Sequence, residues 1–257
     1  MHSLRHYLFV LAALVAVAGD AAAAAIFETV QGEVKVSDGK GPAQAAEPGR
    51  RVNAGSTVQT TAGSRGLLKF DDGHRVLLAS NTEFRINEYN YVPDQPSTGK
   101  MVLSLLRGAL RSVTGLLADR NHSAFALRTP VATIGIRGTD LSVSLTDGAY
   151  LKVDAGAANA VNTGGLIDVN TGQIANIANE STKGILVPQS AVPPGTFGEL
   201  QTMSLGSATG STGEVAAGGG VSGGAAAAIG AAVAAGAALS GGGGDGTTTH
   251  HSTTTHH

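Results

Sequence analysis

The stretch TPVATIGIRGTD, residues 129–140, has the residue types that come closest to a site for chemistry. Its arginine, Arg137, carries a planar fork of donors that can hold a carboxylate or a phosphate. The nearby Asp140 offers a carboxylate to the same fork. We interpret the two side chains as the brace of a turn, because an arginine beside its own aspartate needs no ligand. Contact of Arg137 with an anionic ligand is the alternative.

The other residues of this stretch are expected to shape the backbone. Pro130 cannot donate to a strand ladder and holds Thr129 in an extended conformation. Gly138 permits a left-handed backbone, and Gly135 permits close approach of another backbone. The two isoleucines should face one way and the residues beside them the other. We therefore predict a sharp corner between two core strands. Its structural signature consists of Thr129, Pro130, Gly135, Arg137, Gly138, Thr139 and Asp140.

Paired carboxylates are the other candidates for catalysis. Asp71 with Asp72, or Glu83 with Glu88, could supply the two carboxylates of a glycosidase. A hairpin turn explains Asp71–Gly73 better, because Asp bonds to local backbone N–H groups and Gly supplies a positive φ. The chain has no Cys, and it contains neither G-x-S-x-G nor H-E-x-x-H. We predict no catalytic residue and no enzyme activity.

Two histidines, His74 and His122, fall in the part of the chain that we expect to fold. Neither has a metal-ligand partner at a recognisable spacing, so both are interpreted as ordinary surface or turn residues. The terminal HHSTTTHH is a weak candidate for binding a divalent metal, because neutral imidazole is a good ligand. An unfolded segment must be ordered before it can bind, so we predict no metal site and no cofactor. The weak candidates are His250, His251, His256 and His257.

Composition and the N-terminus limit the partners and the compartment. Net charge is -2 and aromatic residues make up 4% with no Trp, which argues against nucleic acid binding. Arg5 precedes an unbroken apolar run at 8–18, and small residues follow with A-x-A frames ending near Ala18 or at 23–25. These features predict a secretory signal peptide over residues 1–25 and an exported, periplasmic protein.

Residues 26–186 are predicted to form strand after strand. LSVSL at 141–145 alternates apolar and polar residues, as do the segments around Phe84 and Phe125, which is typical of half-buried strands. Two copies of VNTG, eight residues apart, fit a short strand followed by a tight turn. The stretch SLLRGALRSVTGLL at 104–117 is interrupted by glycines and is interpreted as two strands. The expected fold is all-β: a β-roll or solenoid-like domain, or a sandwich of short antiparallel strands.

The composition changes after this region. Prolines from Pro188 onward predict an exit from the domain and a linker at 187–224 rich in Pro, Gly and Ser. Residues 225–239 are Ala- and Gly-rich and form a candidate helix that is not expected to insert into a membrane. The Gly, Thr and His residues at 240–257 predict a disordered low-complexity tail.

Several stretches together resemble the FecR domain family. Besides TPVATIGIRGTD, they are GRRVNAGSTVQTTAGSRGLLKFDDGHRVLLASNTEFRI, LSLLRGALRSVTG and FALRTP, in this order along the chain. The resemblance runs from about Ile26 to Ala178 and implies a single all-β periplasmic domain, partly solenoid-like. It also implies kinship with proteins that relay a signal from an outer-membrane receptor through a cytoplasmic anti-sigma region. The predicted signal peptide leaves no room for such a region, so the expectation is a stand-alone exported domain.

These observations favour a non-enzymatic binding module in the cell envelope. We expect a protein-interaction or signal-sensing scaffold that uses an open sheet edge, with an envelope protein as its partner. A carbohydrate- or peptidoglycan-binding protein, with an envelope polymer as its ligand, is the alternative. The absence of Trp counts against it, because aromatic rings stack on sugars.

Overall fold

The computed structural model describes residues 23–201 of the chain, and these residues are mostly β-strand. The strands of the first half of this region are β1 (Ala23–Gln31), β2 (Val34–Ser37), β3 (Gln44–Ala45), β4 (Arg51–Asn53), β5 (Thr57–Thr60), β6 (Arg65–Phe70), β7 (Arg75–Leu78) and β8 (Glu83–Asn90). The later strands are β9 (Lys100–Val113), β10 (Phe125–Arg128), β11 (Thr133–Thr146), β12 (Gly148–Asn162), β13 (Gly165–Asn170), β14 (Ile174–Ile177) and β15 (Ile185–Val187). The helical segments are short: α1 (Leu116–Arg120), η1 (Pro96–Thr98), η2 (His122–Ala124), η3 (Gln189–Ala191) and η4 (Gly198–Leu200).

Three long strands, β9, β11 and β12, connect all the others. The first half of β9 pairs with β8 and β10, whereas its second half pairs with β7 and β11. β11 and β12 change partners along their length in the same way, since β12 pairs first with β14 and then with β13. Each long strand therefore belongs to two layers.

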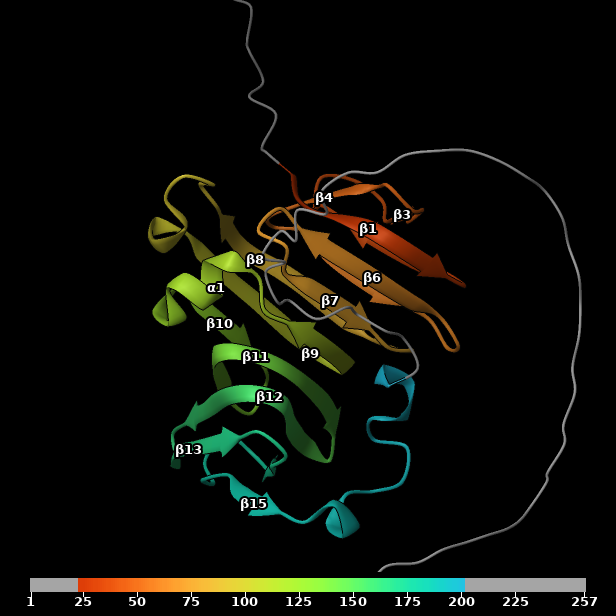
Figure 1. Cartoon of the computed structure of the whole chain (residues 1–257). Helices are drawn as coiled ribbons and strands as arrows, with labels where there is room; N and C mark the ends of the chain where they lie inside the picture. The colour runs from red at the N-terminus through yellow and green to blue at the C-terminus, as the bar shows by residue number, and fades with distance from the viewer. Residues whose placement is uncertain (1–22, 202–257) are drawn as a thin grey trace, which may run out of the picture. The chain divides into compact units, whose positions relative to one another are not determined.

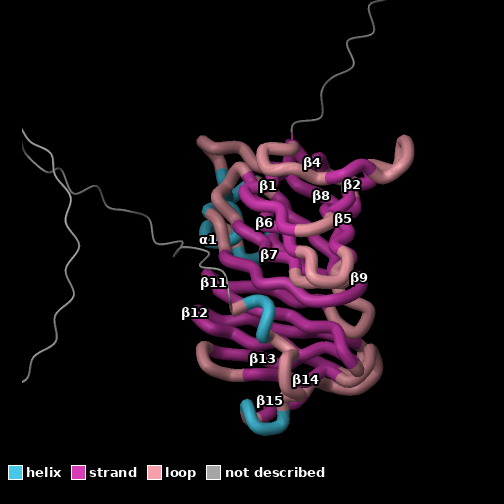
Figure 2. Tube along the Cα trace, turned by 90° about the vertical axis from the view of Figure 1, so that its right-hand side faces the viewer, coloured by secondary structure: helices cyan, strands magenta, loops and turns pink. Residues whose placement is uncertain are grey.

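The two layers consist of one sheet folded over on itself. The first layer has the strand order β4-β1-β6-β7-β9-β11-β12-β14-β15, and the second has β3-β2-β5-β8-β9-β10-β11-β12-β13. Figure 1 shows β1, β6 and β7 beside each other in the first layer, and Figure 2 shows the strands stacked from β4 at the top to β15 at the bottom. All pairings are antiparallel except β9 with β10, whose parallel connection contains α1.

The long strands bend at glycines where they pass from one layer to the other. Gly108, Gly138 and Gly156 have φ of 83°, 57° and 78°, in the left-handed region that Gly adopts without a steric penalty. The register between β11 and β12 shifts at the bends, next to Arg137 and Asp140. A Cβ on Gly156 would collide with the carbonyl oxygen of Gly138. The two bends are therefore nested against each other.

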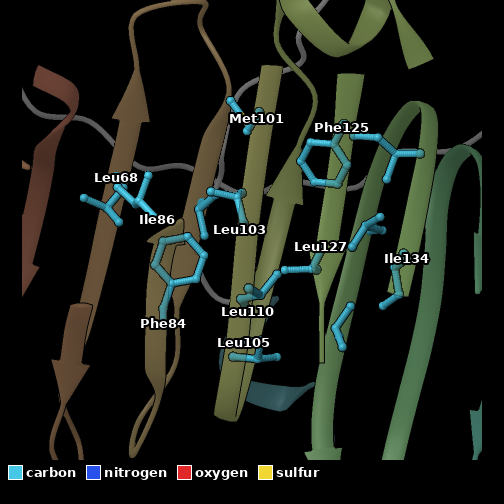
Figure 3. Packing of buried hydrophobic residues seen from close by; sticks show 14 of the residues in the cluster. Leu68, Phe84, Ile86, Met101, Leu103, Leu105, Leu110, Phe125, Leu127 and Ile134 are labelled. Atoms are coloured by element: carbon cyan, nitrogen blue, oxygen red, sulfur yellow. The ribbon is translucent and has the colours of Figure 1, made fainter. Parts of the chain in front are cut away.

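The hydrophobic core lies between the two layers. Leu68 from the first layer packs with Phe84 and Ile86 from the second, and each of these side chains is fully buried. Figure 3 shows these residues together with Leu103 from β9 and Leu127 from β10. Burial of this apolar surface is the main favourable contribution to folding, at roughly 25 cal/mol per Å². The expected all-β fold is confirmed.

Local turn signals predicted the hairpins correctly. Asp71–Gly73 connects β6 to β7, and Gly73 has a positive φ of 84°. The first VNTG copy ends β12 and the second ends β13, so β13 is the short strand that the eight-residue spacing predicts. The expected alternation around Phe84 and Phe125 is also confirmed, because both are buried while Arg85 is exposed.

Two predictions about strand boundaries were wrong. The stretch at 104–117 does not form two strands, because it continues β9 through a bend at Gly108 and ends in α1. The predicted corner at Gly138 lies within one strand, β11, rather than between two. In both cases the glycine bends the strand without ending it, since the ladder continues on each side.

The alternation at 141–145 does not leave its polar residues in water. Ser142 and Ser144 are 3% and 7% exposed. Ser144 lies between its cross-strand neighbours Ala109 and Tyr150, which contribute to a second hydrophobic cluster on the outer face of the first layer. The strand is therefore buried on both faces.

The chain after β15 covers that outer face. Val192, Phe197 and Leu200 pack on residues such as Leu67 and Leu77 and complete the second cluster. The described part of the predicted linker, residues 187–201, is therefore not a linker but part of the domain. The linker prediction failed because apolar residues lie among the prolines of this segment. The prolines shape a segment that packs on the domain rather than one that leaves it.

Hydrogen bonds fix the end of this segment. The Glu199 carboxylate accepts bonds from the Ser80 backbone N–H at 2.8 Å and from the Ser80 hydroxyl at 2.7 Å. These bonds, the backbone one first, lower the pKa of Glu199. The predicted signal peptide before Ala23, the candidate helix at 225–239 and the tail at 240–257 lie outside the described residues.

Replacement of Phe197 tests whether the segment contributes to stability. We expect Phe197→Ala to lower the free energy of unfolding by about 3 kcal/mol, because it removes a buried aromatic ring from the second cluster. Chemical denaturation of the full chain measures the change. The exposed Pro194→Ala should change it by less than about 0.5 kcal/mol. Equal, small effects of both substitutions would show that the segment is only a linker.

Candidate functional site

The turn between β10 and β11 begins the TPVATIGIRGTD stretch. The Thr129 hydroxyl donates to the Ala132 carbonyl at 2.8 Å and accepts from the Ala132 N–H at 3.0 Å. Pro130 is exposed in the middle of this turn. Thr129 and Pro130 therefore shape a tight connection, as their residue types predict.

Beyond the turn, the two faces of β11 differ as expected. Ile134 and Ile136 are 0% and 4% exposed and face the core, while Arg137 is exposed on the other face. Gly135 permits a close approach, but of a side chain rather than of a backbone: a Cβ there would lie 2.8 Å from the Asn159 Oδ1.

The bend itself is held by threonines. Gly138 has the predicted positive φ, and Thr139 is buried directly after it. The Thr139 N–H donates to the Thr114 hydroxyl at 2.8 Å, and that hydroxyl donates to the Thr139 carbonyl at 2.8 Å. These bonds tie the bend in β11 to the end of β9.

Asp140 is braced by a different arginine from the one predicted. Arg111 on β9 donates from Nε and Nη2 to the two Asp140 carboxylate oxygens at 2.9 and 2.6 Å. The hydrogen bond to Asp140 also raises the pKa of Arg111. The interpretation of Arg137 as the brace was wrong, because a cross-strand partner is better placed than a neighbour on the same strand. Contact of Arg137 with an anionic ligand stays a prediction.

A buried polar cluster lies beside this bend and was not predicted. Asp72 is 1% exposed, and its carboxylate accepts bonds from the backbone N–H of His74 and of Leu117 at 3.2 and 3.3 Å. The Tyr89 hydroxyl donates to the same carboxylate at 3.3 Å. Asp72 therefore serves the β6–β7 hairpin, as predicted, and also holds the start of α1.

His74 lies in the β6–β7 turn, as one of the two interpretations has it, but it is fully buried, so its interpretation as a surface residue was wrong. Its ring stacks on Phe125 at 5.5 Å and meets the edge of Phe70 at 5.6 Å. Burial lowers the pKa of His74 from 6.5 to about 4, which keeps the ring neutral at physiological pH. The aromatic residues around position 74 gave no sequence signal, because they come from two different strands, β6 and β10. His122, in contrast, is exposed as expected.

The His74–Ser112 pair has the composition of a hydrolase site but not its geometry. His74 Nε2 lies 2.8 Å from the Ser112 hydroxyl. Ser112 is 2% exposed, so a substrate has no access to it. The third group is also missing from residues 23–201, because His74 Nδ1 has no partner there and Asp72 bonds to the His74 backbone rather than to its ring. The pair is a core contact.

Other candidate chemistry does not converge in the described region. Glu83 lies 4.0 Å from Arg107, and Glu88 lies 2.8 Å from Lys100, so these carboxylates face separate cations. Within residues 23–201, no three His, Asp or Glu side chains come together as metal ligands. The four terminal histidines lie outside this range. A hollow beside Arg50 holds about 190 Å³, below the roughly 300 Å³ of ordinary ligand pockets.

Substitutions at Gly138 test whether the bend is structural. Gly138→Val should lower the free energy of unfolding by about 2 kcal/mol, because a β-branched residue is strained at a φ of 57°. The matched Gly138→Asn should cost less, since Asn tolerates this region, and a Cβ there meets only the Asp119 Oδ1 at 3.7 Å. Arg137→Ala should cost under about 0.5 kcal/mol. Denaturant titration ranks the three variants, and the reverse order would contradict this view of the bend.

Acid should destabilise the domain partly through His74. The unfolded chain protonates this residue below pH 6.5, whereas the folded chain resists protonation down to about pH 4. Stability is therefore present above pH 6.5 and is lost as the pH falls toward 4, by about 2–3 kcal/mol. His74→Gln should lose less free energy of unfolding between pH 7 and pH 4 than the unsubstituted chain. Parallel pH profiles of the two proteins would contradict this role.

Comparison with known proteins finds a family model that matches part of the chain. Residues 56–164 match the family model described as FecR protein. No curated protein matches the sequence. Two crystal structures of a candidate anti-sigma factor from Parabacteroides distasonis ATCC 8503 align with 14% identity and a TM-score of 0.41, covering 51% of this chain and 58% of theirs. None of the helices within residues 23–201 has the length and hydropathy to cross a bilayer. The family match extends from β5 to β12 and contains the whole TPVATIGIRGTD bend, so what the comparison shows is a FecR-type match over residues 56–164 of this chain.

Proposed function

We propose that this chain is an exported, non-enzymatic scaffold that senses a signal by binding a partner protein in the cell envelope. One observation carries the proposal: the end of the two layers at β13 and β15 exposes apolar side chains beside free strand edges. Among the described residues, β13 pairs only with β12, and β15 pairs only with β14.

Apolar exposure is concentrated at this end. Leu166 and Val161 are cross-strand neighbours and are 46% and 43% exposed, and Ile185 and Leu186 on β15 are 61% and 48% exposed. Leu186 faces the interior side of its layer, because the next residue, Val187, packs on the outer cluster. The core is therefore only partly covered where the stack of strands ends.

The opposite end of the stack differs. There the last strands of the two layers are β4 and β3, and Val52 on β4 is 1% exposed. None of the large apolar residues that the structure exposes within residues 23–201 lies on β1 to β4. Stacked β-repeats need covered ends to stay monomeric, so the uncovered β13–β15 end is the better docking surface.

Strand edges favour a protein as the partner. A free edge offers backbone N–H and C=O groups, which an extended polypeptide can match by adding a strand. Leu166 and Leu186 beside these edges supply apolar contacts, which the apolar side chains of a protein can match and a polysaccharide cannot. The FecR domain is consistent with signal sensing rather than with an enzyme.

The sequence at the N-terminus supports export. The charged residue, the apolar run and the frame near Ala18 precede β1, whereas Ala24 and Ala25 lie within β1 and are buried at 1% and 0% exposure. Ala25 also pairs with both Val52 and Phe70. Cleavage at the frame ending near Ala18 leaves β1 intact, whereas cleavage after Ala25 removes its first residues.

Photo-crosslinking in cells tests the proposal. A photoreactive amino acid at position 166 or 185 should form an adduct on the processed, exported form of the full chain. The adduct should be sensitive to protease and resistant to muramidase. The same probe at position 51, an exposed site on β4, should form little or no adduct. We also expect Leu186→Asp to reduce the adduct at position 166 several-fold, because it places a charge in the apolar surface.

Three results would contradict this function. Equal adducts at positions 51 and 166 would show that the β13–β15 end is not the preferred docking surface. Digestion of the adduct by muramidase would indicate a polymer ligand instead. Adducts confined to the unprocessed form would argue against export.

A further inference from the structure

The two outer faces of the domain differ in how their cations are paired. On the central strands of the first layer, each Lys and Arg has an acidic partner within 4.0 Å. These pairs are Arg65 with Glu199, Lys69 and Arg75 with Glu28, Arg111 with Asp140, and Lys152 with Asp154. The first layer therefore has little free positive charge.

Three arginines on the second layer have no such partners. Arg85 on β8, Arg128 on β10 and Arg137 on β11 are exposed, and none of their side chains has a hydrogen bond or ion pair to another residue within 23–201. Their strand neighbours Phe84, Leu127 and Ile136 are buried, so the three arginines point outward. We call them the arginine face.

Register places two of these arginines in one row that leads to the proposed docking end. Arg85 and Arg128 both have Ser104 as their neighbour on β9. Arg128 is then opposite Thr133 on β11, which is opposite Val161 on β12. The row ends with Leu166 on β13, at the edge strand. Arg137 lies on the same face, four residues along β11 from Thr133.

The floor between the arginines is made of small side chains. Ser104 and Ala126 occupy central positions of β9 and β10 on this face, whereas the Asn159 side chain lies against Gly135 on β11. The Ser104 hydroxyl donates to the Asn87 Oδ1 at 2.6 Å, so it is already satisfied. The guanidinium groups therefore provide the free donors of this face, and the half-buried Ala126 between them leaves room for an extended ligand.

We propose that the arginine face binds an acidic, extended polypeptide segment of the partner protein. This inference rests on the proposed function and names the chemistry of the partner. Guanidinium forks match carboxylates, and the row that begins with arginines continues into Val161 and Leu166. A segment with glutamate or aspartate followed by apolar residues matches both parts of this row. A polysaccharide matches only the charged part, and the chain has no Trp to stack on sugar rings.

Strand geometry sets the spacing of the acidic residues. Arg85 and Arg128 are two strand spacings apart, which is roughly 10 Å between their backbones. Three residues of an extended polyproline II segment span roughly 9 Å and bring the side chain back to the same side. Carboxylates at every third position of a segment that crosses the strands therefore fit the two arginines.

Binding of a designed peptide to the full chain tests this inference. The probe is a fluorescent peptide of about 20 residues with glutamate at every third position and two leucines near one end. Fluorescence anisotropy at low salt should show binding that weakens as salt is added. Binding should be lost when glutamine replaces every glutamate. A protein with a net charge of -2 should repel this peptide unless a local cationic face holds it.

A matched pair of triple variants locates the binding site. Arg85→Gln with Arg128→Gln and Arg137→Gln should weaken binding by about tenfold. The control replaces Lys40, Arg51 and Arg120, which are also exposed, with Gln and makes the same change in net charge. It should weaken binding by less than about twofold. Because all six side chains are exposed, thermal unfolding of both variants should match that of the unsubstituted chain.

Several outcomes would overturn the inference. Equal weakening by the two triple variants would show that only net charge matters. Equal or tighter binding of polygalacturonate would indicate an anionic polysaccharide instead. Failure of the peptide to bind, while adducts at position 166 still form in cells, would refute the arginine face and leave the proposed function standing. Peptide binding without any cellular adduct would refute the proposed function and leave the arginine face as a peptide-binding surface.

Discussion

The bends in three long strands are the constraint on which the rest of the structure depends. β9, β11 and β12 each contribute one half to each layer, so the layers cannot move independently of each other. Gly108, Gly138 and Gly156 supply the left-handed backbone at these bends. Because Gly156 packs directly on Gly138, the bends must form together. A continuous hydrophobic core is the consequence. Because these strands pass from one layer to the other, they bring the inner faces of the two layers against one another.

The same architecture gives the two outer faces different surroundings. The chain after β15 returns over the first layer and buries a second cluster around Phe197, next to paired charges. No described segment crosses the second layer in this way, and Arg85 and Arg128 stay exposed and unpaired there. A covered face with satisfied charges is suited to stability, whereas an uncovered face with free donors is suited to binding. The asymmetry follows from the path of the chain after its last strand.

Local signals in the sequence predicted the turns, the strand faces and the positive φ at Gly138, because each depends on a few neighbouring residues. They failed where the decisive partner is distant in sequence. Asp140 bonds to Arg111 rather than to Arg137, and His74 is buried by strands whose residues are far from it along the chain. A proline-rich segment was misjudged for the same reason, since the apolar surface that it covers comes from β6 and β7. Alternation shows which residues face inward but not what lies on the other side of the sheet.

This limit also bears on where function is found in such a chain. TPVATIGIRGTD is the most conspicuous stretch, and most of its residues hold the fold: Thr129 closes a turn, Gly138 bends a strand and Asp140 anchors β11 to β9. Arg137 differs, because its side chain is exposed and has no partner within residues 23–201. Arg85 and Arg128 occupy ordinary alternating positions that no motif distinguishes, yet the pairing of β8 and β10 with β9 aligns them across one serine. Residues that a fold requires produce strong local patterns, whereas residues that a partner requires need only the right register. Recognition in this domain is therefore better inferred from strand pairing than from its signature sequence.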